Sequence, residues 1–441
     1  MKSVWSIIII VFTVVLPRQI VSAQDLTNLG GELSTDLTGH NAIQVVAPNV
    51  TDEIRRTKQL TGFSVFHRIV TREQGLGSRF VNASCGGCHL QNGKGSLSFN
   101  GRNNALDLGS SMVIKVSLKG RERDGGAKKV PGIGTQIQDQ RVDGRAKYDI
   151  KLKWEYISGK YPDGTRFKLR KPKLSFKIPG IRSSRLRHSL RMSPLLIGLG
   201  LLEFIPEETI LALSDPTDSN GDGISGKPNY IPDVRTGNFS LGRFGFKASA
   251  PTVEQQTVAA LLLDMGIKSS LLNGAASAEI SDDELDRLTV YQQIPGVPKA
   301  RNQDDPTVQL GKSLFQSIGC ADCHKMTLQT SPDAPVELAN QTIHPFTDLL
   351  LHDMGPSLSD NRPDYSANGS EWRTTPLWGL GFSEMLANES GISARFMHDG
   401  RARSIEEAIL WHGGESSRSR TNFKNLPANQ RAAVIQFLKS L

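Results

Sequence analysis

Apolar residues recur at helical spacing in several short stretches of the chain. Positions 310, 314, 315 and 318 are apolar and fall on one face of a helix over 310–318, and Gly319 follows as a stop signal. Residues 77–84 are a shorter version of the same stretch, and residues 430–441 form an amphipathic pattern at the end. These periodicities predict short helices and a mainly α fold.

Alternating apolar and polar residues indicate a second kind of element in the first half of the chain. The alternation covers residues 113–118 and 148–156, which predicts short strands inserted into the helical fold. The run 295–306, which begins Pro-Gly-Val-Pro, predicts a linker. We therefore expect two domains, residues 24–294 and residues 307–441, the first expanded by loops and short β-strands.

The first 23 residues have the pattern of a secretory signal peptide. Lys2 is the positive n-region, an apolar run extends from Val4 to Leu16, and small residues precede a cleavage site after Ala23. The run is shorter than the roughly 18 to 20 residues of a membrane-spanning helix, so a retained anchor is the weaker alternative. We expect a periplasmic or secreted protein with no membrane span after cleavage.

All four cysteines fall into two Cys-x-x-Cys pairs, and a histidine follows each pair: Cys85 and Cys88 with His89, and Cys320 and Cys323 with His324. This is the attachment pattern of c-type haem, in which two thiols add to the vinyl groups of one porphyrin and the histidine binds the iron. The alternatives are a redox dithiol or part of a zinc site. Two such motifs in an exported chain favour two covalently bound haem c groups.

Charge is unevenly distributed along the chain. The formal net charge is +8, but residues 115–191 contain 22 Lys and Arg against 7 Asp and Glu, so the rest of the chain is net acidic. Such a basic tract attracts an acidic partner, and a small soluble electron donor, a cytochrome or copper protein, is the expected one. A solvated face without a partner is the alternative. No nucleic-acid recognition motif accompanies the charge, so nucleic acid is not expected.

The sequence resembles the di-haem c-type oxidoreductases described as peroxidases, relatives of the bacterial di-haem cytochrome c peroxidases. The segments that carry the resemblance are residues 191–203, 241–248, 346–355 and 395–412. The resemblance implies two cytochrome c-like domains. It also implies that the second axial ligand of the C-terminal haem precedes a glycine late in the last of these segments, which is His412 here. Met354, Met397 or His352 are alternative ligands.

By the same resemblance, the haem on His89 is the reactive one. The candidates for catalysis on its distal side are Gln136, Gln138, Glu155 and Arg191. His188 is a further polar residue, just before the segment 191–203. Either of two tryptophans, Trp372 or Trp378, is a candidate to bridge the haems, although core packing is the commoner role of tryptophan.

A possible calcium loop begins at Asp218. Asp218, Asn220 and Asp222 occupy positions 1, 3 and 5 of the loop, and Gly223 occupies position 6. The twelfth position is Asn229 instead of the usual glutamate, and Asn-Gly and Asp-Gly also form turns without an ion. Calcium is therefore a hypothesis that rests on half a motif.

Together these features predict a periplasmic di-haem oxidoreductase, peroxidase-like, that reduces peroxide or acts on another small substrate. Electrons are expected to enter at the C-terminal haem and pass to the N-terminal haem. Two different functions remain open: a di-haem electron-transfer cytochrome without catalytic activity, and a thiol or protein side-chain oxidase.

Overall fold

Short helices and short strands alternate along the chain in the computed structural model, which describes residues 25–95, 97, 111–145, 148 and 150–441. The expected signal peptide and its cleavage site lie outside these residues. The α-helices are α1 (Glu53–His67), α2 (Cys85–Cys88), α3 (Leu199–Glu203), α4 (Glu207–Leu211), α5 (Val253–Ala260), α6 (Ser270–Asn273), α7 (Asp282–Gln293), α8 (Pro306–Ser317), α9 (Phe382–Glu389), α10 (Ile405–Trp411), α11 (Ser417–Asn425) and α12 (Ala428–Ser440).

The strands form several small sheets. They are β1 (Ser34–Thr35), β2 (Arg79–Phe80), β3 (Met112–Leu118), β4 (Gln136–Ile137), β5 (Gln140–Arg141), β6 (Gly144–Arg145), β7 (Lys151–Lys160), β8 (Arg166–Ser175), β9 (Leu186–Met192), β10 (Tyr230–Pro232), β11 (Phe239–Leu241), β12 (Val297–Pro298), β13 (Leu328–Gln329), β14 (Thr342–Ile343), β15 (Leu351–Asp353) and β16 (Glu371–Arg373). Sheet orders are β4-β3-β9, β2-β5-β6 and five two-stranded pairs.

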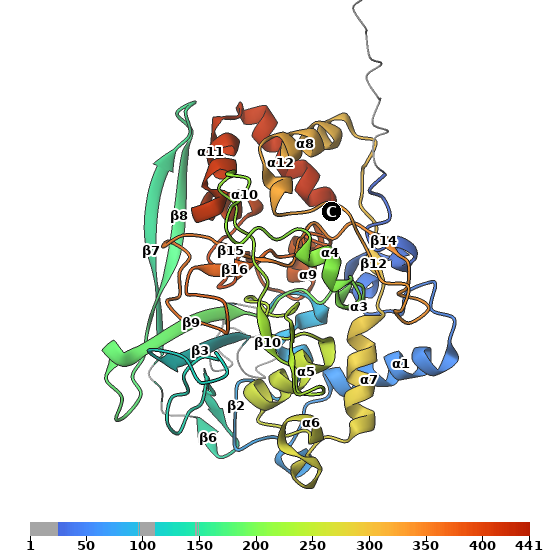
Figure 1. The fold of residues 1–441 in the computed structure, drawn as a ribbon, viewed down its shortest axis with the longest axis vertical. Helices are drawn as coiled ribbons and strands as arrows, with labels where there is room; N and C mark the ends of the chain where they lie inside the picture. The colour runs from blue at the N-terminus through green and yellow to red at the C-terminus, as the bar shows by residue number, and fades with distance from the viewer. Residues whose placement is uncertain (1–24, 96, 98–110, 146–147, 149) are drawn as a thin grey trace, which may run out of the picture.

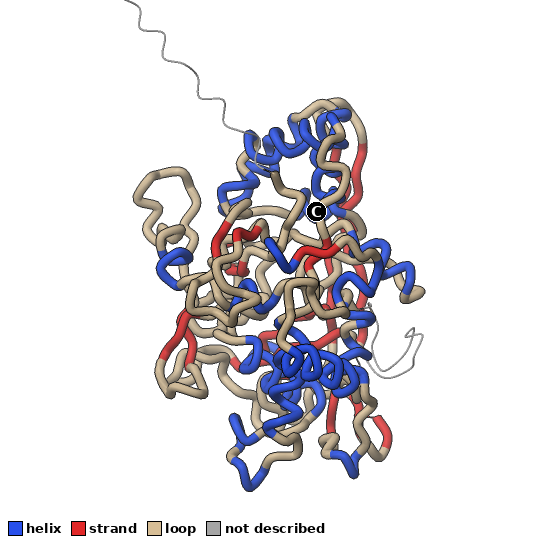
Figure 2. The backbone as a smooth tube through the Cα atoms, turned by 90° about the vertical axis from the view of Figure 1, so that its right-hand side faces the viewer, coloured by secondary structure: helices blue, strands red, loops and turns tan. Residues whose placement is uncertain are grey.

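The expectation of a mainly α fold is wrong. The structure is 33% helical and 19% strand, and loops separate its elements almost everywhere (Figure 2). The difference arises mainly between residues 112 and 192, where β3 and β9 pair over seven residues and β7 and β8 pair over ten. The alternation over 113–118 and 148–156 did predict strands there, but not their length.

Each haem-motif region contains a pair of helices that cross at a glycine. In α1, a Cβ on Gly62 would lie 2.2 Å from the carbonyl oxygen of Arg287 in α7. In α8, a Cβ on Gly311 would lie 2.1 Å from the carbonyl oxygen of Ala433 in α12. A side chain at either glycine would push the backbones apart, so glycine permits the close crossing. The expected helices over 310–318 and 430–441 are α8 and α12.

The helix expected over 77–84 does not form. Residues 79 and 80 belong to β2, which pairs with β5. Gly77 instead packs directly on Gly266, where a Cβ would lie 2.6 Å from the Gly266 Cα. The helix that corresponds to α8 in the first motif region is α1, farther upstream in the sequence. Tertiary packing overrides the weak local periodicity here.

One large hydrophobic core joins the two halves of the chain. Its buried residues extend from Leu26 to Leu441, and Val297, inside the expected linker 295–306, is part of it. The linker segment also forms β12, which pairs in parallel with β1. Near the N-terminus, the Leu29 carbonyl accepts a hydrogen bond of 2.7 Å from the His344 backbone N–H. The first described residues therefore pack on the last third of the chain.

Figure 1 shows α8, α10, α11 and α12 at one end of the molecule and α1, α5, α6 and α7 toward the other. The β7–β8 hairpin stands beside the C-terminal helices, although its sequence belongs to the first half. In the described part of the chain, no helix is long and apolar enough to cross a membrane.

Candidate functional site

The first Cys-x-x-Cys-His motif lies on the short helix α2 and directly after it. Cys88 is buried and Cys85 half-buried, and burial raises the pKa of the Cys85 thiol to about 12. His89 Nδ1 lies 3.0 Å from the carbonyl oxygen of Pro194, which follows β9. A carbonyl can only accept, so Nδ1 is the donor and the neutral ring keeps its lone pair on Nε2. Burial lowers the pKa of His89 to about 4, which keeps the ring neutral.

The second motif repeats this arrangement. Cys320 lies in a 3-10 turn after α8, and His324 Nδ1 lies 2.8 Å from the carbonyl oxygen of Phe346. Burial lowers the pKa of His324 to about 4 and raises the pKa of the Cys320 thiol to about 12. The Nε2 lone pair of His324 is therefore also available to a metal.

His412 is a third histidine with the same anchoring. Ser404 caps α10 by accepting a hydrogen bond from the Glu407 backbone N–H, and His412 follows the last residue of the helix. Its Nδ1 lies 2.9 Å from the carbonyl oxygen of Ala408. Burial lowers the pKa of His412, and His412 lines the same cavity as His324.

One cavity of about 750 Å³ connects both motifs. Its wall contains the four motif cysteines, His89, His324 and His412, together with apolar side chains such as Leu196 and Met354. Among the described residues, neither cysteine pair is joined by a disulfide. The thiol pairs, the metal-binding lone pairs and the apolar wall fit c-type haem, a large apolar cofactor with a central iron.

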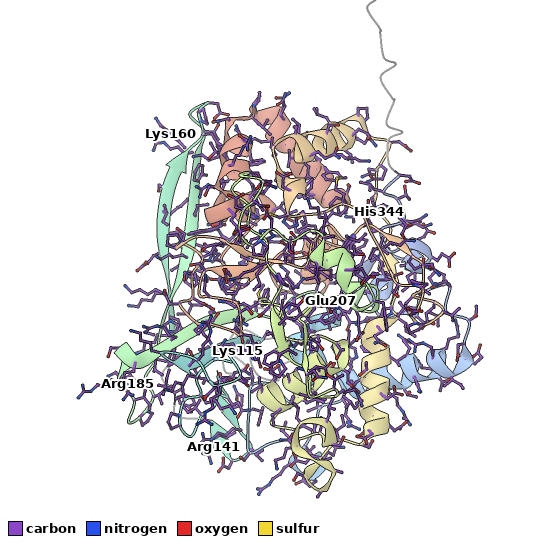
Figure 3. All side chains as sticks on the ribbon, in the orientation of Figure 1. Lys115, Arg141, Lys160, Arg185, Glu207 and His344 are labelled. Carbon is purple, nitrogen blue, oxygen red and sulfur yellow. The ribbon has the colours of Figure 1, made fainter. Side chains whose placement is uncertain are left out.

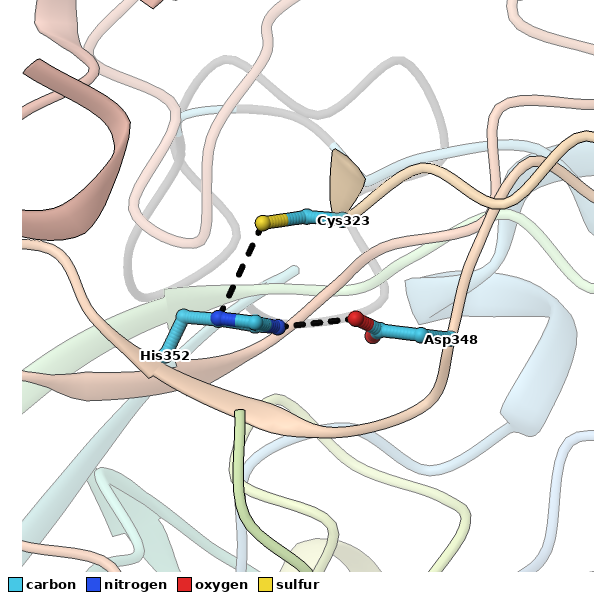
Figure 4. Close-up of side chains that lie close together, drawn as sticks. All are labelled: Cys323, Asp348 and His352. Atoms are coloured by element: carbon cyan, nitrogen blue, oxygen red, sulfur yellow. Dashed lines mark hydrogen bonds and ion pairs between the residues drawn. The ribbon is translucent and has the colours of Figure 1, made fainter. Parts of the chain in front are cut away.

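A zinc site fits less well. The one grouping of three described Cys, His, Asp or Glu side chains with metal-binding geometry consists of Cys323, Asp348 and His352, and it includes neither His89 nor His324 (Figure 4).

His352 is held from both sides by carboxylates. Its Nε2 lies 2.8 Å from Asp348 Oδ2 and its Nδ1 lies 2.7 Å from Glu415 Oε2 (Figure 4 shows the contacts to Asp348 and Cys323). Burial alone would lower the pKa of His352, but the hydrogen bonds to Asp348, Cys323 and Glu415 raise it to about 12. The ring is an imidazolium with both nitrogens engaged, so it has no lone pair for iron.

Met354 and Met397, the two methionines that could ligate the iron in place of His412, both line the cavity. The sulfur of Met354 accepts a contact of 3.8 Å from the hydroxyl of Ser416. Met397 has a left-handed backbone with φ of 66°, one residue before His398. Neither has the fixed orientation that the Ala408 carbonyl gives to His412.

Trp372 and His398 form a stacked pair in the cavity wall. Their ring centres are 3.7 Å apart with planes at 13°, and Trp372 Nε1 donates to the Leu358 carbonyl at 3.1 Å. Lys247 Nζ lies 4.5 Å from the centre of the Trp372 ring. Trp378 also lines the cavity, and it packs so closely on Gly198 that a Cβ there would lie 2.4 Å from the indole.

Arg191 lies in the same wall, at the end of β9. Its Nε donates to Ser189 Oγ at 3.2 Å, and its Nη2 forms ion pairs of 3.6 Å with Asp360 and 3.8 Å with Asp364. Among the described residues, Nη2 has no hydrogen-bond acceptor. A buried guanidinium with a spare donor suits a carboxylate in the cavity, such as a haem propionate.

The remaining candidate catalytic residues do not line the cavity. Gln136 Nε2 donates to Leu263 O at 2.9 Å and to Asp264 Oδ1 at 2.6 Å, and Gln138 Nε2 donates to Leu263 O at 3.0 Å. Glu155 lies on the exposed β7, 3.0 Å from Lys173 Nζ, which lowers the pKa of Glu155. His188 is exposed, and its ring meets Phe176 edge to face. We assign no proton-transfer role to Glu155 or His188.

The sequence interpretation missed Asp264. It lines the cavity from a π-helical turn, Leu261–Met265, directly after α5. Burial raises the pKa of Asp264, although Lys115 and the Gln136 hydrogen bond oppose the shift, and Asp264 in turn raises the thiol pKa values of Cys85 and Cys88. The sequence signal that could have identified Asp264 is one acidic residue within the otherwise apolar run Leu-Leu-Leu-Asp-Met.

The expected calcium loop is an exposed turn held by its own hydrogen bonds. Asp218 accepts from the Gly223 backbone N–H, Asn220 Oδ1 from that of Asp222, and Asp222 Oδ1 from that of Ile224. Asn229 at the twelfth position is buried and donates to the Lys247 carbonyl at 2.7 Å. Calcium binding at this loop stays a prediction.

A family model described as "Di-haem oxidoreductase, putative peroxidase" matches residues 24–274 and 268–441. Similar solved structures include hydrazine synthase from Kuenenia stuttgartiensis pressurised with xenon, with 15% identity over 57% of this chain and 73% of that chain and a TM-score of 0.31. A MauG-like protein associated with microbial copper homeostasis has 18% identity over 54% of this chain and 89% of that chain, with a TM-score of 0.27. No curated protein matches the chain.

Proposed function

Because the chain belongs to the di-haem oxidoreductase family, we propose that it is an exported enzyme with two covalently attached haem c groups and a peroxidase-like activity. The observation that carries the proposal is the single cavity shared by both Cys-x-x-Cys pairs and three histidines, each anchored through Nδ1. Electrons enter at the C-terminal haem and pass to the N-terminal haem, where peroxide or another small substrate is reduced.

Each half of the chain would hold one haem through its own pair of cysteines. Cys85 and Cys88 would hold the N-terminal haem, and His89 would supply an imidazole ligand to its iron. Cys320 and Cys323 would hold the C-terminal haem, and His324 and His412 would supply imidazole ligands to its iron. The presence of His412 and His324 in the wall of the same cavity supports this assignment. When bound, haem with two imidazole ligands supports electron transfer, and haem with one imidazole has an open position for substrate.

The residues around the N-terminal motif bind and protonate the substrate in this proposal. Asp264 is the acid, because burial favours its protonated form and the Gln136 amide fixes its carboxyl. Gln136 is therefore a positioning residue for Asp264, and Gln138 holds the same π-helical turn. Arg191 binds a carboxylate of the cofactor through its spare Nη2 donor.

Trp372 is the proposed contact between the two haem sites. Its stack on His398 and its hydrogen bond to the Leu358 carbonyl fix the plane of the indole in the wall of the shared cavity. The nearby Lys247, whose pKa burial lowers to about 8, disfavours positive charge on the ring when it is protonated. Electron transfer through Trp372 therefore depends on whether Lys247 carries a positive charge.

The proposal includes export, a partner and an ion. The signal sequence directs the chain to the periplasm, where the electron donor is a small soluble cytochrome or copper protein. Calcium occupies the loop of Asp218, Asn220 and Asp222, and this loop connects to the C-terminal site because Ser225 donates from N and Oγ to Glu415, which in turn holds His352.

The test is spectroscopy of the purified, exported protein. We expect a pyridine haemochrome spectrum of haem c, with two haems per chain, that falls to one haem in Cys85→Ser/Cys88→Ser and in Cys320→Ser/Cys323→Ser. Addition of peroxide should change the spectrum of the high-spin haem and consume peroxide. Two low-spin haems in every redox state, with no peroxide consumption, would identify an electron-transfer cytochrome instead.

A further inference from the structure

The β7–β8 hairpin is an isolated two-stranded sheet on the outside of the molecule. The strands pair in register from Lys151 opposite Ser175 to Lys160 opposite Arg166. In the described part of the chain, no further strand joins this sheet. Figure 1 shows it along the side of α10 and α11, and Figure 3 places Lys160 at its outer end.

The hairpin packs directly on the helix that precedes His412. Tyr161 Oη donates to Glu406 at 2.7 Å, and the Arg170 backbone N–H donates to Glu407 Oε1 at 3.0 Å; both acids lie on α10. The Arg170 guanidinium donates from Nε to the Arg401 carbonyl at 3.1 Å and stacks on Trp154 at 3.9 Å. A single helix therefore separates the hairpin from the proposed iron ligand.

The hairpin is strongly basic. Residues 151–175 contain eight Lys and Arg but two acids, and the structure pairs Glu155 with Lys173 and Asp163 with Arg431. The acids are thus already used within the chain. The exposed cations Lys160, Arg166 and Lys168 share one face of the hairpin, because Lys160 lies opposite Arg166 and Ser158 lies opposite Lys168.

Each face of the hairpin has one exposed apolar side chain on β7. Tyr156 is 53% exposed, and Lys168 Nζ lies 4.3 Å from the centre of its ring. Ile157, the next residue, is 46% exposed and points to the opposite face, because successive side chains of a strand alternate. The face of Tyr156 therefore combines an exposed aromatic ring with exposed positive charge, which is typical of protein interfaces with an apolar core and a polar rim.

We propose that the β7–β8 hairpin is the docking surface for the acidic face of the protein electron donor. The proposal rests on the proposed function, because it assigns the place of electron entry to the C-terminal haem site. The charges on the hairpin attract an acidic donor, and its packing on α10 brings the bound donor within one helix of His412. The hairpin part of the basic tract therefore serves the C-terminal site, although its sequence belongs to the first half.

The experiment compares two triple charge reversals. Lys160→Glu/Arg166→Glu/Lys168→Glu alters one face of the hairpin, and Lys119→Glu/Arg182→Glu/Arg185→Glu gives the same net charge at exposed positions outside it (Figure 3 shows Arg185 far from Lys160). Stopped-flow absorbance measures electron transfer from the dithionite-reduced, haem-loaded proteins to oxidised plastocyanin, an acidic copper protein, because transfer in this direction is downhill from a haem with two imidazole ligands and uses the same docking surface. Basic mitochondrial cytochrome c serves as the probe of opposite charge.

We expect the second-order rate constant for plastocyanin at low ionic strength to fall at least tenfold in the hairpin variant and less than twofold in the control variant. The rate for basic cytochrome c should not fall. Equal losses in both variants, no loss in the hairpin variant, or no electron transfer from the unaltered protein to plastocyanin would each overturn the proposal.

Two further measurements distinguish a loss of docking from damage to the haem sites. Reduction by dithionite should be equal in all three proteins, which verifies intact haem sites, and peroxide consumption with a small artificial reductant tests the proposed function independently of docking. Sedimentation with phosphatidylglycerol vesicles tests a lipid surface as the occupant. If vesicle binding is lost in the hairpin variant while the plastocyanin rate is unchanged, the docking proposal is wrong and the hairpin binds lipid.

Discussion

The crossing of α8 and α12 gives a prediction whose size follows from the structure. In Gly311→Ala, the new Cβ would lie 2.1 Å from the carbonyl oxygen of Ala433 and 2.8 Å from the Cβ of Phe437. Ordinary contact begins at 3.4 Å, so the helices must separate by about 1.3 Å at this point. Because the oxygen belongs to a helix backbone, it cannot rotate away as a side chain could.

Overpacking of this kind costs about 1 to 3 kcal/mol. The higher helix propensity of Ala offsets about 1 kcal/mol of that cost. We therefore expect Gly311→Ala to lower the free energy of unfolding by up to about 2 kcal/mol. The change should reduce Tm by several degrees, because about 1 kcal/mol corresponds to roughly 2 to 4 °C in a domain of 150 to 250 residues.

The assay is thermal and urea unfolding of the haem-loaded protein, followed by circular dichroism. Ser313→Ala is the matched control, because Ser313 lies exposed on the same helix and its substitution adds no contact. Haem content should be measured as well, since α8 leads directly into Cys320. If Gly311→Ala unfolds at the same temperature and urea concentration as Ser313→Ala, the close crossing does not limit the packing and our reasoning is wrong.

Three more predictions concern the site. His412→Met should change the low-spin haem spectrum and raise its potential, measured by redox titration, because a thioether ligand favours the reduced iron more than imidazole does; an unchanged spectrum would exclude His412 as a ligand. Asp264→Asn should slow peroxide consumption. Because burial raises the pKa of Asp264, ionisation of this carboxyl destabilises the folded protein as the pH rises above 3.8, its ordinary pKa. The variant should therefore be more stable than the unaltered protein at neutral pH and equally stable below pH 3.8. Calcium removal by a chelator should lower Tm in the unaltered protein but not in Asp222→Asn, and equal melting with and without chelator would argue against the ion.

The sequence predicted features well where they depend on a single helix or a single motif. The periodicity over 310–318 and 430–441 corresponds to α8 and α12, and the motif spacing identified the cysteines and histidines that the cavity brings together. His412 was predicted by resemblance and stays a prediction, and the structure adds its Nδ1 anchor at Ala408. In these cases the residues concerned are close together in the sequence, so the sequence alone shows their pattern.

The features that depend on distant contacts were not predictable in the same way. Gly77 meets Gly266 in space, and this contact, not the apolar spacing of 77–84, decides the local conformation. The sequence offered Gln136 as a candidate catalytic residue, but its hydrogen-bond partner Asp264, which the sequence interpretation missed, lies on a different element. The mainly α expectation likewise failed in part because β3 pairs with β9, 68 to 80 positions later in the chain, and local periodicity does not display such a pairing.

The packing of the first described residues on the last third of the chain has a kinetic consequence. A chain is synthesised from its N-terminus, yet Leu29 finds its partner His344 more than 300 positions later. Contacts of such long sequence separation form slowly, and larger proteins fold through intermediates. The shared core therefore closes late, after the last third of the chain is present. During that interval the cysteine pairs, which are buried or half-buried in the folded protein, remain accessible, so the haem attachment that we propose would precede closure of the core.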